Sequence, residues 1–242
     1  MRPNLKSPPY VIAYAGLMAA LFTAAIMTLH VATEPVVRRN KELFRQRAYV
    51  ELFALGDPKT MTPAQVAEVV RKRIVERTEP LVDPQTGEQI QLVEAYGQDG
   101  KLVGYAIPIW GVGFWARIDG LLAVSPDLTR TMGVVFLSHS ETPGLGGRIT
   151  EDDFRRQFRQ GKDITPSRAG GPFLTISPEK IAAGDPRYAR HVDAITGATG
   201  TSTALDKFLN ERLRRFRRAA TAAGMIAPGP APGAGDPLDR RQ

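Results

Sequence analysis

The chain has 242 residues, of which 43% are apolar, and a formal net charge of +7. This length suits one folded domain with additional segments. The chain has no cysteine and three histidines, which excludes disulfides, thiolate metal sites, iron–sulfur clusters and cysteine nucleophiles and disfavours a zinc or haem site. Redox chemistry in this chain would therefore depend on a bound organic cofactor.

A long apolar stretch lies near the N-terminus. No charged residue occurs between Lys6 and Glu34, and residues 11–32 form the apolar run. A helix of that length crosses a hydrocarbon core about 30 Å thick. A cleaved signal peptide is the competing interpretation, but the run is longer than the apolar region of such peptides, and His30 and Ala32 make a poor cleavage pair. The sequence predicts an uncleaved, single transmembrane helix.

Charged residues on both sides of this helix bear on its orientation. Two basic residues, Arg2 and Lys6, precede it. More basic residues follow it closely: Arg38, Arg39, Lys41, Arg45 and Arg47. Because basic residues favour the cytoplasmic side, charge taken alone predicts that the bulk of the chain is cytoplasmic.

Two helices and a turn are predicted after the anchor. The apolar spacing continues the anchor as a juxtamembrane helix, which Gly56–Pro58 should end. Thr62, Pro63 and Gln65 form a capping box at the start of a second helix that runs through "VAEVVRKRIV". The stretch "DPQTGE", residues 83–88, predicts a turn.

From Leu92 the apolar period becomes that of strands. Four short stretches, "LVEAY", "LVGYAIPI", "DGLLAVS" and "MGVVFLS", are separated by turns and predict an antiparallel sheet. Thr150 with Asp153 should cap a short helix, and "PFLTIS" should add a strand. A final helix is predicted from Thr201, and Gly224 should stop it.

These elements predict an α+β protein in which an N-terminal transmembrane helix precedes a twisted antiparallel sheet packed with helices. The final helix carries a basic run that we interpret as a solvated face, because no aromatic or groove-reading motif suggests nucleic-acid binding: Arg212, Arg214, Arg215, Arg217 and Arg218. The predicted divisions are an N-terminal segment (1–10), the transmembrane helix (11–32), juxtamembrane helices (33–80), a folded domain (81–224) and a disordered tail (225–242).

Two loops are candidates for a binding site. "HSETPGLGGR", residues 139–148, holds three glycines and a proline, so its backbone can approach a flat or anionic group closely, although a plain connection has the same composition. "DAITGATGTS", residues 193–202, places threonines where a helix begins and where free N–H groups favour a phosphate. An ordinary threonine or serine helix cap is the alternative.

The motifs in these loops resemble a known family. Asp193 followed by "TGAT" is similar to the flavinylation motif Asp-x-x-Ser/Thr-Gly-Ala-Thr of the FMN-binding domain, which is shared by the C subunit of the sodium-translocating NADH:quinone oxidoreductase (Nqr) and the G subunit of the Rnf complex. "ETPGLG", residues 141–146, resembles the family's other signature. The Gly-x-Gly-x-Trp segment from Gly111 to Trp115 and "EPLVDPQTGE" resemble the Nqr form, and the resemblance extends from the anchor to about Arg218.

The resemblance implies that residues 81–224 bind FMN covalently. In the family a flavin transferase takes the FMN moiety from FAD and joins its phosphate to the last threonine of the motif, here Thr199. Asp193 would orient the motif, help to hold a metal ion during transfer or form a turn. We expect the following residues at the cofactor, with Trp115 alternatively in the core: Thr199, Thr196, Gly197, Ala198, Asp193, Glu141, Thr142, Leu145, Gly146 and Trp115. No resident metal is expected.

The resemblance also implies a role as an electron-relay subunit of a membrane complex that oxidises NADH, reduces quinone and exports sodium. No nucleotide-binding glycine fingerprint follows a strand, so hydride acceptance would belong to another subunit. The partners would be the other subunits, the membrane and the flavin transferase. In the family the flavin domain lies on the periplasmic side of the bacterial inner membrane, which is opposite to the orientation that charge alone predicts.

Other functions remain open from the sequence. A protein similar to the G subunit of Rnf, or a free-standing membrane FMN-binding protein, would carry the same motifs but serve another electron acceptor. A membrane-tethered scaffold with an empty flavin loop belongs to a different class, and the intact Thr199 argues against it.

Overall fold

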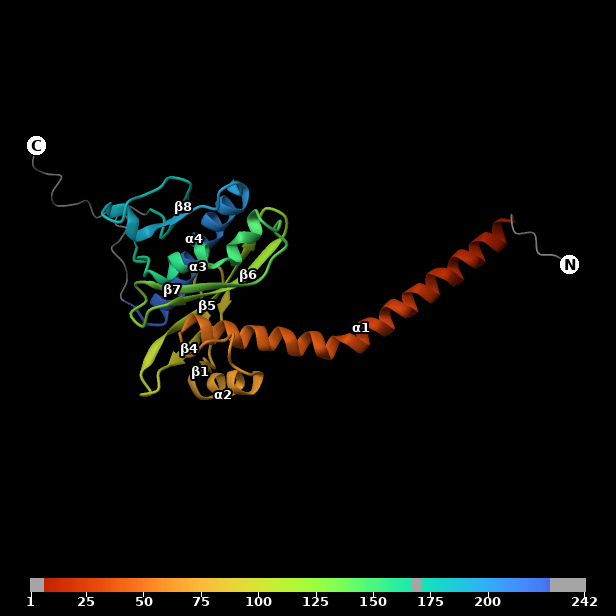
Figure 1. Cartoon of the computed structure of the whole chain (residues 1–242), viewed down its shortest axis with the longest axis horizontal. Helices are drawn as coiled ribbons and strands as arrows, with labels where there is room; N and C mark the ends of the chain where they lie inside the picture. The colour runs from red at the N-terminus through yellow and green to blue at the C-terminus, as the bar shows by residue number, and fades with distance from the viewer. Residues whose placement is uncertain (1–6, 167–170, 227–242) are drawn as a thin grey trace, which may run out of the picture. The chain divides into compact units, whose positions relative to one another are not determined.

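The computed structural model describes residues 7–166 and 171–226 (Figure 1). The chain divides between Phe44 and Arg45 into two compact units. The elements, in chain order, are α1 (Pro8–Leu52), α2 (Pro63–Arg73), β1 (Ile74–Glu76), β2 (Leu81–Val82), β3 (Gln89–Ile90), β4 (Val93–Tyr96), β5 (Leu102–Val112), β6 (Arg117–Val124), β7 (Thr131–Ser138), η1 (Gly146–Thr150), α3 (Asp152–Arg159), β8 (Thr175–Ser177), η2 (Pro186–Arg190), β9 (His191–Asp193) and α4 (Thr199–Ala222).

Helix α1 is 45 residues long and contains Pro35. It is the one helix among the described residues that is long and apolar enough to cross a membrane. The prediction that it ends at Gly56–Pro58 is wrong, because it ends at Leu52. Ala54 adopts a left-handed φ of 48°, and Leu55 N–H donates to the Val50 carbonyl at 3.0 Å. The helix therefore ends four residues before Gly56, the first residue of the predicted end.

An antiparallel sheet in the order β1-β4-β5-β6-β7 forms the centre of the second unit. This arrangement confirms the predicted α+β fold with an antiparallel sheet. Strand β1 was missed, because the predicted second helix continued to Val75, whereas α2 ends at Arg73 and Ile74 already pairs with Ala95 of β4. β-branched residues at the end of "VAEVVRKRIV" suit a strand once a partner strand is available.

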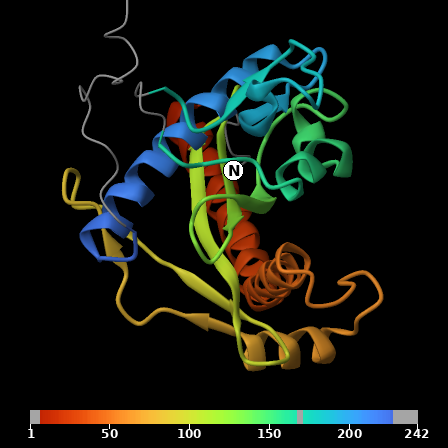
Figure 2. The same ribbon diagram turned by 90° about the vertical axis from the view of Figure 1, so that its left-hand side faces the viewer.

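The sheet is buried on both faces. On one face, α4 and α3 cover a core that includes Ile109, Leu122 and Phe136 (Figure 2). On the other face, the last turns of α1, including Tyr49, pack on Ala106 and neighbouring residues of the central strands. This double burial explains why the strand sequences are nearly continuous apolar runs and do not alternate with polar residues.

Two small strand pairs accompany the main sheet. β2 and β3 form an antiparallel hairpin around the predicted 83–88 turn, where Gly87 has a φ of 69°. β8 falls within the predicted "PFLTIS" strand, but it pairs in parallel with β9 and not with the main sheet. Strand β9 was not predicted, and it leads directly into the 193–202 loop.

Two further expectations need correction. Thr150 does not cap α3, because residues 146–150 form a 3₁₀ turn in which its hydroxyl donates to the Gly147 carbonyl, and Glu151 takes the cap position. Met225 and Ile226, which were predicted to begin the disordered tail, pack against the core. The rest of the predicted tail, 227–242, lies outside the described residues.

Candidate functional site

The "TGAT" motif lies between β9 and the first turn of α4. Gly197 has a φ of 80°, which turns the chain, and Thr199 is the first residue of the 24-residue helix. The cap position is Ala198, which makes no side-chain cap hydrogen bond, so the alternative of an ordinary threonine cap is wrong. Thr199 is exposed, at the helix end whose free N–H groups and dipole favour a negative group.

The "ETPGLG" motif forms a tight turn beside that helix end. Leu145 N–H and Gly147 N–H both donate to the Thr142 carbonyl, at 3.1 and 2.9 Å. Position 144 favours glycine, because its φ of 75° lies in the left-handed region. The turn leaves the Leu145 side chain about half exposed, next to the Gly197 backbone.

Glu141 is buried beneath both loops. Its Oε1 accepts hydrogen bonds from Phe114 N–H at 2.9 Å and Trp115 N–H at 3.1 Å, and its Oε2 accepts one from the Thr201 hydroxyl at 2.5 Å. A Cβ at Gly146 would lie 2.3 Å from Thr201 Oγ1 and 2.7 Å from Glu141 Oε2. We call the three hydrogen bonds that the Glu141 carboxylate accepts the carboxylate clasp. The clasp joins the 113–116 turn, the "ETPGLG" turn and α4, so Glu141 helps to hold the wall of the site together. Its predicted contact with a cofactor stays a prediction.

Trp115 belongs to the surface and not to the core. Its side chain is 67% exposed, and its indole N–H donates to Thr142 Oγ1 at 3.1 Å. Phe114 packs edge-on against it, with ring centroids 5.2 Å apart. The Phe114 ring also occupies the space that a Cβ at Gly200 would need, with 2.4 Å to the nearest ring atom. Two aromatic rings therefore stand beside the first turn of α4.

These parts together form one groove with a cavity volume of about 190 Å³. It brings together eight of the ten predicted cofactor residues, and sequence reasoning missed three of its residues: Phe114, Gly200 and Thr201. All three lie within stretches that the sequence analysis singled out, Phe114 in Gly111–Trp115 and the other two in the 193–202 loop. Their place in the groove depends on contacts between distant segments, such as that of Thr201 with Glu141, 60 residues away. The groove offers an exposed hydroxyl, a helix N-terminus and exposed apolar side chains, which suits an aromatic group with an attached phosphate.

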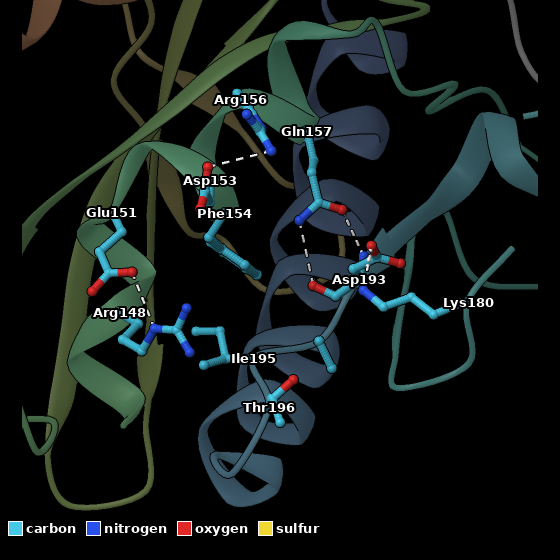
Figure 3. A pocket seen from close by; sticks show the side chains of 11 residues that line it. Arg148, Glu151, Asp153, Phe154, Arg156, Gln157, Lys180, Asp193, Ile195 and Thr196 are labelled. Atoms are coloured by element: carbon cyan, nitrogen blue, oxygen red, sulfur yellow. Dashed lines mark hydrogen bonds and ion pairs between the residues drawn. The ribbon is translucent and has the colours of Figure 1, made fainter. Parts of the chain in front are cut away.

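Asp193 and Thr196, the other two predicted residues, line a neighbouring pocket of about 250 Å³ (Figure 3). Lys180 Nζ lies 2.7 Å from one carboxylate oxygen of Asp193, and His191 Nε2 lies 3.2 Å from the other. Partial burial raises the pKa of Asp193, but the hydrogen bonds and charges of Lys180 and His191 outweigh it and hold the pKa below its usual value. Among the described residues, no group of three or more histidine, aspartate or glutamate side chains is placed to hold a metal ion.

A comparison with known families gives a match over the part of the chain that forms the groove. Residues 113–214 match the model of the FMN-binding domain, and this range contains the whole groove. This part of the chain is therefore similar to an FMN-binding domain. The match covers β6, β7, α3, both glycine turns and most of α4.

Similar proteins extend the comparison beyond the FMN-binding domain. The C subunit of the Na⁺-translocating NADH-quinone reductase of Pseudomonas aeruginosa is 26% identical, over 86% of this chain and 92% of that protein. The G subunit of the proton-translocating ferredoxin:NAD⁺ oxidoreductase complex of Clostridium ljungdahlii is 32% identical, over 48% of this chain and 54% of that protein. The chain thus spans nearly all of the first relative and about half of the second.

A solved structure supports the fold. The crystal structure of NqrC from Shewanella oneidensis superposes with a TM-score of 0.57 and 21% identity, over 76% of this chain and 90% of that chain. At this identity the likeness concerns the fold alone.

Proposed function

We propose that this protein is a membrane-anchored flavoprotein subunit that relays electrons through FMN joined by a phosphodiester to Thr199. The observation that carries the proposal is the groove, in which an exposed threonine at the start of α4 faces the aromatic pair and the "ETPGLG" turn. The FMN-binding domain and the likeness to the C subunit of a Na⁺-translocating NADH-quinone reductase support it.

The residues present fit FMN. The phosphodiester needs a hydroxyl, which Thr199 supplies, and its remaining negative charge suits the N-terminus of a 24-residue helix. Gly197 and Gly200 lack side chains beside Leu145 and Phe114, so the groove stays open at the attachment point. Trp115 and Leu145 offer exposed apolar surface for a flat ring.

When bound, FMN accepts electrons and passes them on, and the chain's own residues attach, orient and shield it. Thr199 is the point of attachment, and the helix N-terminus holds the phosphate. The carboxylate clasp keeps Trp115 and the first turn of α4 at a fixed separation. Because Trp115, Leu145 and Thr199 are exposed at the groove, a cofactor held there would remain within reach of an electron partner.

The proposed setting is a complex that oxidises NADH, reduces quinone and exports sodium, with NADH oxidation in another subunit. Helix α1 would anchor the protein in a bacterial inner membrane, with the flavin domain on the periplasmic side, where the flavin transferase works. The likeness to the Pseudomonas protein favours this setting over an Rnf-type complex, because that alignment covers almost the whole relative.

Covalent attachment can be tested by expressing the full chain with and without a flavin transferase and recording flavin fluorescence on denaturing gels. The wild-type band should fluoresce only with the transferase, and Thr199→Val should abolish the signal while the protein folds normally. Thr203→Val, one turn further along the exposed part of α4, is the matched control and should retain full fluorescence. A fluorescent Thr199→Val band would overturn attachment at Thr199, and a dark wild-type band would overturn the proposal and favour the empty scaffold.

The relay role has its own test. The purified, flavinylated chain should not oxidise NADH at a useful rate, but after chemical reduction it should pass electrons to a soluble acceptor. Rapid, flavin-dependent NADH oxidation by the isolated chain would contradict a relay function.

A further inference from the structure

Helix α3 lies between the C-terminal end of α1 and the loop that carries Thr199. Its Arg155 Nη1 lies 2.8 Å from Glu51 Oε1 near the end of α1, and Phe154 and Phe158 are buried in the core. Gln157, on the same helix, points to Asp193 at the start of the loop (Figure 3). The position of the Gln157 side chain is therefore set by a helix that is held by both apolar and ionic contacts.

Gln157 binds both backbone hydrogen-bonding groups of Asp193. Its Oε1 accepts a hydrogen bond from Asp193 N–H at 2.7 Å, and its Nε2 donates to the Asp193 carbonyl at 3.4 Å. On the opposite edge, β9 pairs with β8, and Ala194 N–H donates to the Ser177 carbonyl at 2.9 Å. The amide of Gln157 thus takes the place of a neighbouring strand at the free edge of β9.

The far end of the loop is held by a second set of contacts. Ile195 N–H donates to Ser202 Oγ at 3.1 Å, and Ala198 N–H donates to the Ile195 carbonyl at 3.0 Å. Thr196 and Gly197 are exposed between these points. Because Lys180 and His191 bind only the carboxylate of Asp193, Gln157 is the side chain that holds its peptide groups on the edge away from β8.

We propose that Gln157 is a positioning residue for the attachment of FMN: by holding Asp193, it presets the loop so that the Thr199 hydroxyl faces the flavin transferase. This inference rests on the proposed attachment at Thr199. In that step the Thr199 Oγ–phosphorus bond forms as the P–O–P bond of FAD breaks, AMP leaves and the hydroxyl proton passes to solvent. A loop that is freed at Asp193 would reach the competent conformation in only a fraction of molecules. The KM for the acceptor protein would then rise, while kcat would change little.

The test measures initial rates of FMN attachment to the full chain in detergent, with a purified flavin transferase and FAD, over a range of acceptor concentrations. Gln157→Met keeps the length of the side chain but removes both hydrogen bonds, and we expect its KM to rise about tenfold with kcat within about twofold of wild type. Gln157→Glu keeps the acceptor for Asp193 N–H and should recover most of the loss. Gln160→Met, at the C-terminal cap of the same helix and bonded to Tyr188, is the matched control and should behave as wild type.

Hydrogen exchange at the Asp193 amide provides a readout without flavin. Exchange should be faster in Gln157→Met than in wild type or Gln160→Met, with similar melting temperatures. If Gln157→Met does not fold, Gln157→Asn, whose shorter amide cannot span the same gap, replaces it. A wild-type KM together with unchanged Asp193 exchange in the variant would overturn the inference while leaving attachment at Thr199 intact. Absence of attachment in the wild-type chain would instead refute the proposed function itself.

Discussion

The two ends of α4 show how one helix serves two purposes. At its first turn, Thr199 and Gly200 are exposed and adjoin the groove. At its last turns, arginines bind the β2–β3 hairpin: Arg218 makes two bonds to Asp83, at 2.6 and 2.8 Å, and Arg215 lies 2.7 Å from Glu88. We call this end the arginine clamp. One end of the helix is left open for a ligand, whereas the other is fixed by charge.

The arginine clamp corrects the interpretation of the basic run as a solvated face. Arg212 is buried, pairs with Glu88 and stacks 3.8 Å from the centre of the Trp110 ring. Burial lowers the pKa of Arg217, whose guanidinium donates to the Leu128 and Ile164 carbonyls. Most of the arginines of this helix therefore bind partners within the protein. The groove at the other end of the helix has few charged side chains.

The largest effect on stability is expected at the clamp. Asp83→Ala removes a fully buried carboxylate and leaves Arg218 without its partner, so the free energy of unfolding should fall by about 3 kcal/mol. FMN attachment should continue, because the groove is at the other end of α4. Urea unfolding and gel fluorescence together check this separation. Asp153→Ala, which breaks an exposed pair with Arg156, is the control and should cost under about 1 kcal/mol.

The carboxylate clasp should couple stability to function. Glu141→Ala removes a buried carboxylate and leaves the N–H groups of Phe114 and Trp115 without their acceptor, and we expect a loss of about 2 kcal/mol in the free energy of unfolding. Unlike Asp83→Ala, this variant should also attach FMN more slowly, because Thr201 and the first turn of α4 lose their tie to the groove wall. If Glu141→Ala is less stable but attaches FMN at the normal rate, the clasp stabilises the fold and has no role in attachment.

Gly146 tests how closely the clasp is packed. In Gly146→Ala the new Cβ would displace Thr201 Oγ1 or Glu141 Oε2, so we expect a loss of about 1–2 kcal/mol and a changed flavin spectrum or potential. Gly144→Ala is the comparison, because a Cβ there meets no atom within 4 Å and adds only backbone strain. If Gly146→Ala melts lower but has full flavin content and an unchanged spectrum, the turn has no cofactor role.

The smallest effect concerns pH. The hydrogen bond from Arg218 holds the pKa of Asp83 well below its usual range, despite the opposing effect of burial. Because the folded-state pKa is lowered, the contribution of Asp83 to stability is complete above its unfolded pKa, about 3.9, and declines as pH falls below that value. The stability difference between wild type and Asp83→Asn should thus be full at pH 7 and smaller at pH 3. A difference that grows on acidification would contradict the clamp.

The features that depend on neighbouring residues in the chain could be predicted from the sequence. "TGAT" and "ETPGLG" are recognisable because they are short, continuous motifs, in which Gly197 and Gly144 take up the positive φ that the turns require. The long N-terminal helix and the central strands follow from continuous apolar runs. Contacts between distant segments were not predictable. Gln157 and Asp193 are 36 residues apart, and no periodic pattern indicates that they meet. Likewise β1 and β9 are short strands that exist because partner strands are present.

The central claim is that FMN is attached at Thr199, at the open end of α4. Its most direct test is peptide mapping by mass spectrometry of the full chain after expression with a flavin transferase. We predict that FMN phosphate is found on Thr199 and on none of the neighbouring hydroxyl residues Thr196, Thr201, Ser202 and Thr203. FMN located on one of those residues, or peptides from this loop without any flavin, would contradict the account.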